Sequence, residues 1–320
     1  MPAKRPRISD RATAMLSVSD TERINHIRKD FWLGHAGAKK ILSELERLLT
    51  YPRMRTMPHV IIVGERGFGK RTVMHRFYQK NPPLKTNKDG KTHFSQIPVL
   101  LIESPAKPEE QRLYYRILEA INCLPNASVG AAELESRTYT LLKSVNIKIL
   151  MIKNADDIIA GDRQVFKEMR KVLVKLSEEV QTSLVLSGTV EAKLHLDSDP
   201  RTENLFKPLY LMKWKLVNSE DDPGAKEPPT EFIRFLKSYE HILPLKNTSN
   251  LANPETAKSI LEATEGILGE VISLIKSAAE LAITTGTECI DQDVLKKLDY
   301  KSPTERKRMS KEIAMGLGLT

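Results

Sequence analysis

Residues 60–72, VIIVGERGFGKRT, constrain the fold of this chain more than any other stretch. A β-branched run leads into a glycine-rich turn, and an apolar helical pattern follows it. A phosphate-binding loop has this order, with glycines (here Gly64, Gly67 and Gly69) for the tight turn and a lysine (Lys70) that reaches the β- and γ-phosphates. A turn that merely joins a strand to a helix is the alternative, and the strand and the lysine in register argue against it.

The loop departs from the usual motif at its last position. Arg71 stands where a Ser or Thr hydroxyl normally holds Mg²⁺. Thr72 could supply a hydroxyl only if the loop slid by one residue, which would turn that side chain about 100° around the helix. The sequence therefore predicts a nucleotide loop that has lost its metal ligand.

Composition is typical of a globular α/β protein with a basic surface. The 320 residues leave room for one α/β domain and a smaller attachment, and the net charge is +9. An acidic partner such as nucleic acid explains this charge as well as solubilising tails do. The excess gathers near both ends: Lys4, Arg5, Arg7 and Arg11, then Lys301, Arg306, Lys307, Arg308 and Lys311.

The sequence offers no sign of a membrane span, a secretion signal or a metal site. No apolar run approaches the roughly 20 residues of a membrane helix, so a cytoplasmic protein without membrane contact is expected. Two cysteines are too few for a disulfide framework, and neither they nor the seven histidines form a metal-binding pattern.

Strand and helix patterns alternate through the middle of the chain, which favours a parallel sheet. Strands are predicted near 60–63, 99–102, 147–152, 184–186 and 209–212. We expect a basic disordered tail at 1–18, an N-terminal helical extension at 19–58, and an α/β nucleotide-binding core at 59–217. A polar linker at 218–229, a helical lid at 230–300 and a basic tail at 301–320 complete the chain.

Several short stretches together resemble the TniB/TnsC family, the AAA+ regulators of DNA transposition. They are Arg23-Ile24, Trp32-Leu33-Gly34, Gly69-Lys70, Ala160-Gly161, Gly188-Thr189, Phe206-Lys207-Pro208, Trp214, Leu243-Pro244-Leu245 and Ala263 to Gly266. The resemblance covers nearly the whole chain. It implies an AAA+ P-loop NTPase core with a parallel sheet, an N-terminal helical extension and a C-terminal helical lid. It also implies ATP bound between subunits, assembly on DNA, and delivery of a target to a transposase.

Most catalytic positions of the family are changed here. The Walker B strand should end in Asp-Glu, and the corresponding pair is Lys153-Asn154. The arginine expected before Phe206 is Leu205. The resemblance therefore leaves no catalytic residue and no metal ligand. The candidate nucleotide site comprises Gly64, Gly67, Gly69, Lys70, Arg71, Thr72, Lys153, Asn154 and Thr189.

These changes act on one reaction. Two cations, Arg71 and Lys153, at the positions that hold Mg²⁺ would repel the ion. Asn154 cannot act as a base, and Leu205 cannot reach a neighbour's γ-phosphate as an arginine does. Two later acids, at 156 and 157, are expected in a loop as solvated or helix-capping carboxylates. ATP hydrolysis is expected to be absent or very weak.

Two outcomes stay open for the nucleotide, ATP or ADP. In one, Lys70, Arg71 and Lys153 together neutralise the phosphates in place of Mg²⁺. In the other, the cations repel one another, the pocket stays empty, and Arg71 and Lys153 turn outward or pair with Asp156 and Asp157.

DNA contacts are expected in the loop after the second strand or in the basic tails. Lys107 and Arg112 could meet phosphates there, but Glu109 and Glu110 oppose them, so a solvated loop is as good an interpretation. The leading hypothesis is a non-hydrolysing adaptor that works with a transposase, target-selection proteins and an intact TniB-like paralogue or further copies of itself. An active ATPase that assembles on DNA is the alternative, and an interaction protein that uses neither ligand is the third.

Overall fold

The computed structural model describes residues 8–88, 91–124, 129–159, 163–198, 203–218 and 226–317. The chain forms two compact units, each described here by itself. The sheet unit is Gly37–Met212, and the helical unit combines Met1–Ala36 with Lys213–Thr320.

A five-stranded parallel sheet forms the centre of the sheet unit, with the strand order β4-β5-β6-β1-β7. The strands are β1 (His59–Val63), β4 (Val99–Glu103), β5 (Ile149–Lys153), β6 (Ser183–Gly188) and β7 (Phe206–Tyr210). Every residue of β1 and β6 is buried, as expected for central strands covered on both faces. The parallel sheet predicted from the alternating pattern is confirmed.

The last strand begins three residues earlier than predicted. β7 contains Pro208, which has no N–H for a ladder and so discouraged a strand assignment. Because β7 lies at the edge of the sheet and pairs only with β1, one side of it needs no partner and the proline is tolerated.

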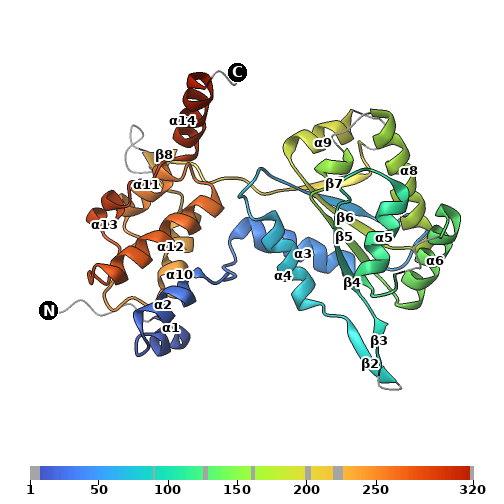
Figure 1. Ribbon diagram of the computed structural model, residues 1–320, viewed down its shortest axis with the longest axis horizontal. Helices are drawn as coiled ribbons and strands as arrows, with labels where there is room; N and C mark the ends of the chain where they lie inside the picture. The colour runs from blue at the N-terminus through green and yellow to red at the C-terminus, as the bar shows by residue number, and fades with distance from the viewer. Residues whose placement is uncertain are drawn as a thin grey trace. The chain divides into compact units, whose positions relative to one another are not determined.

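Helices pack against this sheet in the order expected for crossover connections (Figure 1). They are α3 (Ala36–Leu49), α4 (Lys70–Lys80), α5 (Glu110–Ala120), α6 (Ala131–Ser144), α7 (Asp156–Ile159), α8 (Arg163–Val180) and α9 (Val190–Asp197). One apolar cluster joins strands β1, β4, β5 and β6 to α5, α6 and α8. This core fixes the strand ends that carry the candidate site.

An antiparallel hairpin, β2 (Leu84–Lys88) and β3 (Lys91–Gln96), lies in the polar segment between α4 and β4. It projects from the end of α4 (Figure 1). The stretch lacks apolar alternation, so its pattern gave no strand signal. The turn dipeptide at 89–90 lies outside the described residues.

The helical unit contains α1 (Asp10–Met15) and α2 (Asp20–Arg28) together with the lid helices. The latter are α10 (Thr230–Glu240), α11 (Pro254–Ala263), α12 (Leu268–Thr284) and α13 (Gln292–Lys297). A capping box begins α2, with Ser19 and Glu22 bonded to each other's backbone N–H. The single extension predicted at 19–58 is wrong, because the chain divides between Ala36 and Gly37.

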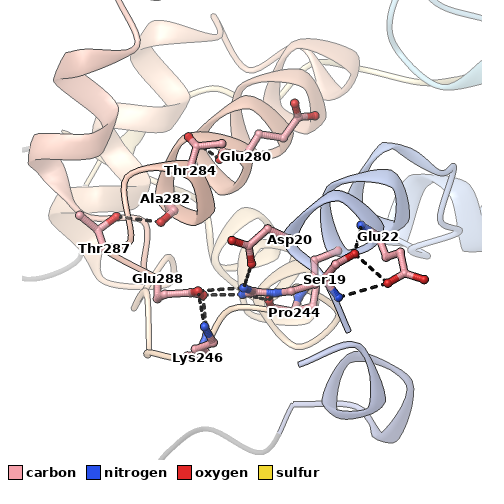
Figure 2. A network of polar contacts seen from close by, with 11 residues as sticks. Ser19, Asp20, Glu22, Pro244, Lys246, Glu280, Ala282, Thr284, Thr287 and Glu288 are labelled. Atoms are coloured by element: carbon pink, nitrogen blue, oxygen red, sulfur yellow. Dashed lines mark hydrogen bonds and ion pairs between the residues drawn. The ribbon is translucent and has the colours of Figure 1, made fainter. Parts of the chain in front are cut away.

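Arg23 of α2 explains why the N-terminal helices join the lid. The side chain of Arg23 is 1% exposed. Its guanidinium donates to the carbonyl oxygen of Pro244 at 2.7 and 3.2 Å, to Asp20 at 3.0 Å and to both carboxylate oxygens of Glu288. Figure 2 shows that Glu288 also contacts Lys246. The Lys246 ammonium lies 2.9 Å from a carboxylate oxygen of Glu288. The contacts of Arg23 with Pro244 and Glu288 connect residues more than 200 positions apart, which periodicity could not predict.

Both terminal segments contain helices. α1 lies within the tail predicted to be disordered, and residues 1–7, with Lys4, Arg5 and Arg7, lie outside the described residues. The basic tail at 301–320 is largely α14 (Pro303–Gly316), with a capping box between Ser302 and Glu305. None of its residues is buried, and it leads away from the other helices of its unit (Figure 1).

Several connecting segments lie outside the described residues. These are 125–128, 160–162 (with Ala160 and Gly161), 199–202 and the linker residues 219–225. The rest of that linker carries two short paired strands, β8 (Val217–Asn218) and β9 (Lys226–Glu227). Within the described ranges, no helix is long and apolar enough to cross a membrane.

Candidate nucleotide site

The loop between β1 and α4 has the backbone of a phosphate cradle. Gly67 (φ 80°) and Gly69 (φ 90°) adopt left-handed conformations that other residues rarely take, and Gly69 caps α4. A Cβ on Gly64 would lie 2.9 Å from the carbonyl oxygen of Leu211, so this glycine also permits close packing. The loop thus places the N-terminus of α4, with its free N–H groups, at the carboxyl edge of the sheet.

Lys70 is half-buried at this helix N-terminus. Its ammonium donates to the carbonyl oxygens of Gly64 and Glu65, the second at 3.2 Å. Burial lowers the pKa of Lys70, while the negative charges of Asp156 and Glu65 act in the opposite direction and Arg66 adds to the lowering. A partly desolvated cation folded against the loop is well prepared to receive an anion.

Arg71 and Thr72 are both exposed on the first turn of α4. No hydrogen bond or ion pair joins the Arg71 side chain to another residue among those described. Burial lowers the pKa of His75, one turn further along, and the nearby positive charges of Lys153 and Arg71 add to this effect while Glu103 opposes it. Arg71, His75 and Lys153 therefore form one electrostatic neighbourhood beside the loop.

The end of β5 carries a cation clamped to an acid from the next strand. Lys153 and Glu103 are direct register partners on β5 and β4, and their charged groups lie 2.7 Å apart. Asn154 donates from its side-chain amide to the other oxygen of Glu103, and its own backbone is left-handed (φ 53°). Of the alternatives left open for an empty pocket, the pairing of Lys153 with Asp156 or Asp157 is therefore wrong. The acid at this edge sits on β4 instead.

Asp156 and Thr189 also form a specific contact. Asp156 begins α7 and accepts hydrogen bonds from the Thr189 backbone N–H at 2.7 Å and its hydroxyl at 2.6 Å. Thr189 in turn caps α9 by accepting from Ala192. The prediction placed both acids in a loop, and this is wrong because both lie in α7. Asp157 is exposed, as predicted for a solvated carboxylate, whereas Asp156 holds Thr189 and lies near enough to affect Lys70.

Leu205, at the position of the missing arginine, has a structural role in this chain. Leu205 packs against the apolar core of the sheet unit. Its neighbour Lys207, on β7, pairs with Glu44 of α3 at 2.9 Å. Leu205 has no charge, and the Lys207 ammonium is already paired. Neither side chain can therefore replace an arginine that reaches another subunit.

Residues 23–216, more than half of the chain, match the family model described as "Bacterial TniB protein". The chain belongs to the TniB family. No curated protein sequence matches it.

Solved structures show that this TniB-family chain has the AAA+ P-loop NTPase fold. The Aeropyrum pernix ORC2 protein in its ADP form has a TM-score of 0.58 at 14% identity, over 85% of this chain and 71% of that one. Cdc6p from Pyrobaculum aerophilum has a TM-score of 0.56 at 14% identity, over 85% and 68%. The Aeropyrum pernix ORC1 protein in complex with DNA has a TM-score of 0.54 at 15% identity, over 86% and 68%.

The residues of this TniB-family protein fit a nucleotide's phosphates and do not fit the magnesium ion that usually accompanies them. The glycine cradle, the α4 N-terminus and Lys70 suit an anion. Arg71 replaces the hydroxyl ligand, and Glu103 already pairs with Lys153 and accepts a hydrogen bond from Asn154. Within the described residues, no group of three or more His, Cys, Asp or Glu side chains could hold a metal ion.

The two predicted DNA-contact residues lie on the segment that leads into α5. Lys107 is exposed, while Arg112 pairs with Glu109 at 2.5 Å, with both side chains about half exposed. Of the two predicted DNA contacts, the charge of Arg112 is therefore already neutralised by Glu109, at the start of the same helix.

Proposed function

We propose that this chain is a TniB-like regulator of DNA transposition that binds nucleotide without hydrolysing it and acts as an adaptor. The observation that carries this proposal is the arrangement at the end of β5. The position for a metal-binding acid holds Lys153, the position for the water-activating acid holds Asn154, and both bind Glu103. An ammonium and an amide there can bind phosphate oxygens, but an ammonium cannot hold Mg²⁺ and an amide cannot remove a proton from water.

Nucleotide binding would rest on cations supplied by the chain itself. Lys70 and the loop N–H groups would hold the phosphates, and Arg71, with no partner among the described residues, would add a two-pronged contact. Bound ATP or ADP would supply binding energy that stabilises one arrangement of subunits or partners. The neighbour solved in its ADP form supports this use of the fold.

Partners follow from the family and the charge. A transposase, target-selection proteins and an intact TniB-like paralogue or further copies of this chain are the proposed protein partners. The net charge of +9 and the DNA complex of the ORC1 neighbour support contact with DNA.

One observation favours the alternative of a working ATPase. Asp156 lies beside Lys70 and Thr189, so a carboxylate is present at the site after all. Both hydrogen bonds from Thr189 go to the same oxygen of Asp156, which leaves the second oxygen for another donor.

Steady-state ATP hydrolysis with DNA present tests the proposal. We expect phosphate release no faster than that of a Lys70→Ala variant measured alongside. Turnover by the natural protein that vanishes in Lys70→Ala would contradict it. Loss of that same turnover in Asp156→Asn would then assign the activity to the alternative acid.

A further inference from the structure

We propose that Glu103 determines which nucleotides the site accepts, by competing with phosphate for Lys153 and Asn154. This inference rests on the proposed nucleotide binding and adds a specificity-determining residue to it. Glu103 was not among the candidates from sequence, because it lies on β4 and outside every motif of the family.

Register explains how Glu103 reaches the site. Parallel strands end together at one edge of a sheet, and the last pair of the β4–β5 ladder is Glu103 with Lys153. Just beyond this pair, the backbone N–H of Ser104 donates to the carbonyl oxygen of Lys153 at 2.9 Å. The backbone of both partners is therefore fixed, and their side chains meet without any loop having to move.

Glu103 binds the side-chain donors of both Lys153 and Asn154 at the end of β5. One carboxylate oxygen of Glu103 takes the Lys153 ammonium at 2.7 Å, and the other takes the Asn154 amide. Lys153 is 12% exposed, whereas Glu103 is 44% exposed. The cation is thus held in place by the fold, and the acid is the partner that solvent can draw away.

A ligand that uses Lys153 must replace this carboxylate. The exchange substitutes one anion for another on the same donors, so the ligand with more negative charge gains more from it. A triphosphate carries more charge than a diphosphate and extends further from the loop. Glu103 therefore weakens the binding of both nucleotides, and it weakens ATP binding more than ADP binding.

The neighbouring charges are consistent with an exchangeable acid. The positive charges of Arg71 and Lys153 both act on His75, and Glu103 opposes them. When Glu103 is replaced by a neutral group, this edge of the site becomes more positive without any change in the loop that binds the phosphates. The variant therefore isolates the competition from the cradle.

Titration of a fluorescent ATP and a fluorescent ADP in EDTA tests the inference. The variant is Glu103→Gln, which keeps the shape and an acceptor for Asn154. The control is Glu109→Gln, which removes an exposed acid that pairs with Arg112 instead. We expect Glu103→Gln to tighten ATP binding about fivefold, the scale of a partly exposed ion pair, and to tighten ADP binding less, so that the preference for ATP widens. Glu109→Gln should match the natural protein.

Lys153→Met gives a second, opposite arm. It removes the cation for which phosphate and Glu103 compete, so it should weaken ATP binding and bring ATP and ADP closer together. Circular dichroism melts establish that each variant is folded. Binding by the natural protein that Glu103→Gln leaves unchanged or weakens would overturn the role of Glu103 alone. No binding by the natural protein or by Glu103→Gln would overturn the proposed nucleotide binding, and this inference with it.

Discussion

Replacing Arg23 by Met should destabilise the helical unit strongly, although Arg23 is far in sequence from the nucleotide loop. Methionine keeps most of the buried volume and removes the hydrogen bonds to Pro244 and the charge opposite Glu288. Glu288 is 7% exposed, and its pairing with Arg23 lowers its pKa to about 2. Relative to the usual value of 4.5, this shift corresponds to about 3 kcal/mol.

The loss should therefore be about 3 kcal/mol, the lower end of the range for breaking a buried pair, because Lys246 still contacts Glu288. The matched control is Arg28→Met on the same helix. Arg28 is 61% exposed and pairs with Glu280 at 2.7 Å, so its removal should cost less than about 1 kcal/mol.

Urea unfolding followed by tryptophan fluorescence measures this difference directly. Both tryptophans of the chain, Trp32 and Trp214, belong to the helical unit, so the signal reports that unit alone. Equal free energies of unfolding for Arg23→Met and Arg28→Met would refute the reasoning from burial.

Three further predictions concern the buried His59, the basic helix α14 and the lost metal ligands. Burial lowers the pKa of His59 to about 4, so its neutral form contributes fully to the stability of the sheet unit above the unfolded pKa of 6.5. The free energy of unfolding should fall by about 3 kcal/mol as the pH falls from 6.5 to 4, and far-UV circular dichroism in urea should show this loss. A His59→Gln variant that keeps the same pH dependence would contradict this prediction. Replacing both Lys307 and Lys311 of the exposed α14 by Ala should reduce the salt dependence of DNA binding by about two phosphate contacts, and an unchanged slope of log K against log salt would place the DNA contacts elsewhere. Replacing Arg71 by Thr and Lys153 by Asp together should make ATP binding depend on Mg²⁺, and binding of the double variant that stays the same in EDTA would argue against the assigned metal positions.

The fold could be predicted from the sequence because its signals are local. The β-branched run at 60–63, the glycine loop and the apolar stripe of α3 each determine their own structure, and their order leaves few topologies. The hairpin β2–β3 could not be predicted, since its strands carry no apolar face. The helix α14 was not predicted, although Ser302-Pro303-Thr304-Glu305 is a helix-start pattern that could have indicated it.

The site was only partly accessible to sequence reasoning. Motif spacing located Lys70, Arg71 and Lys153 on the correct elements, because the family fixes those distances along the chain. The partners of these residues depend on strand register and helix packing instead. Glu103 meets Lys153 across a ladder from 50 positions away, and Asp156 meets Thr189 from a neighbouring strand end. Pairings of this kind need the structure.

Binding of ATP in EDTA and in Mg²⁺ tests the central claim most directly. If Lys70, Arg71 and Lys153 take the place of the metal ion, the dissociation constant for ATP should be the same in both conditions, and millimolar ATP should raise the melting temperature equally in both. Binding that is tenfold or more tighter with Mg²⁺, or no binding in either condition, would contradict the account.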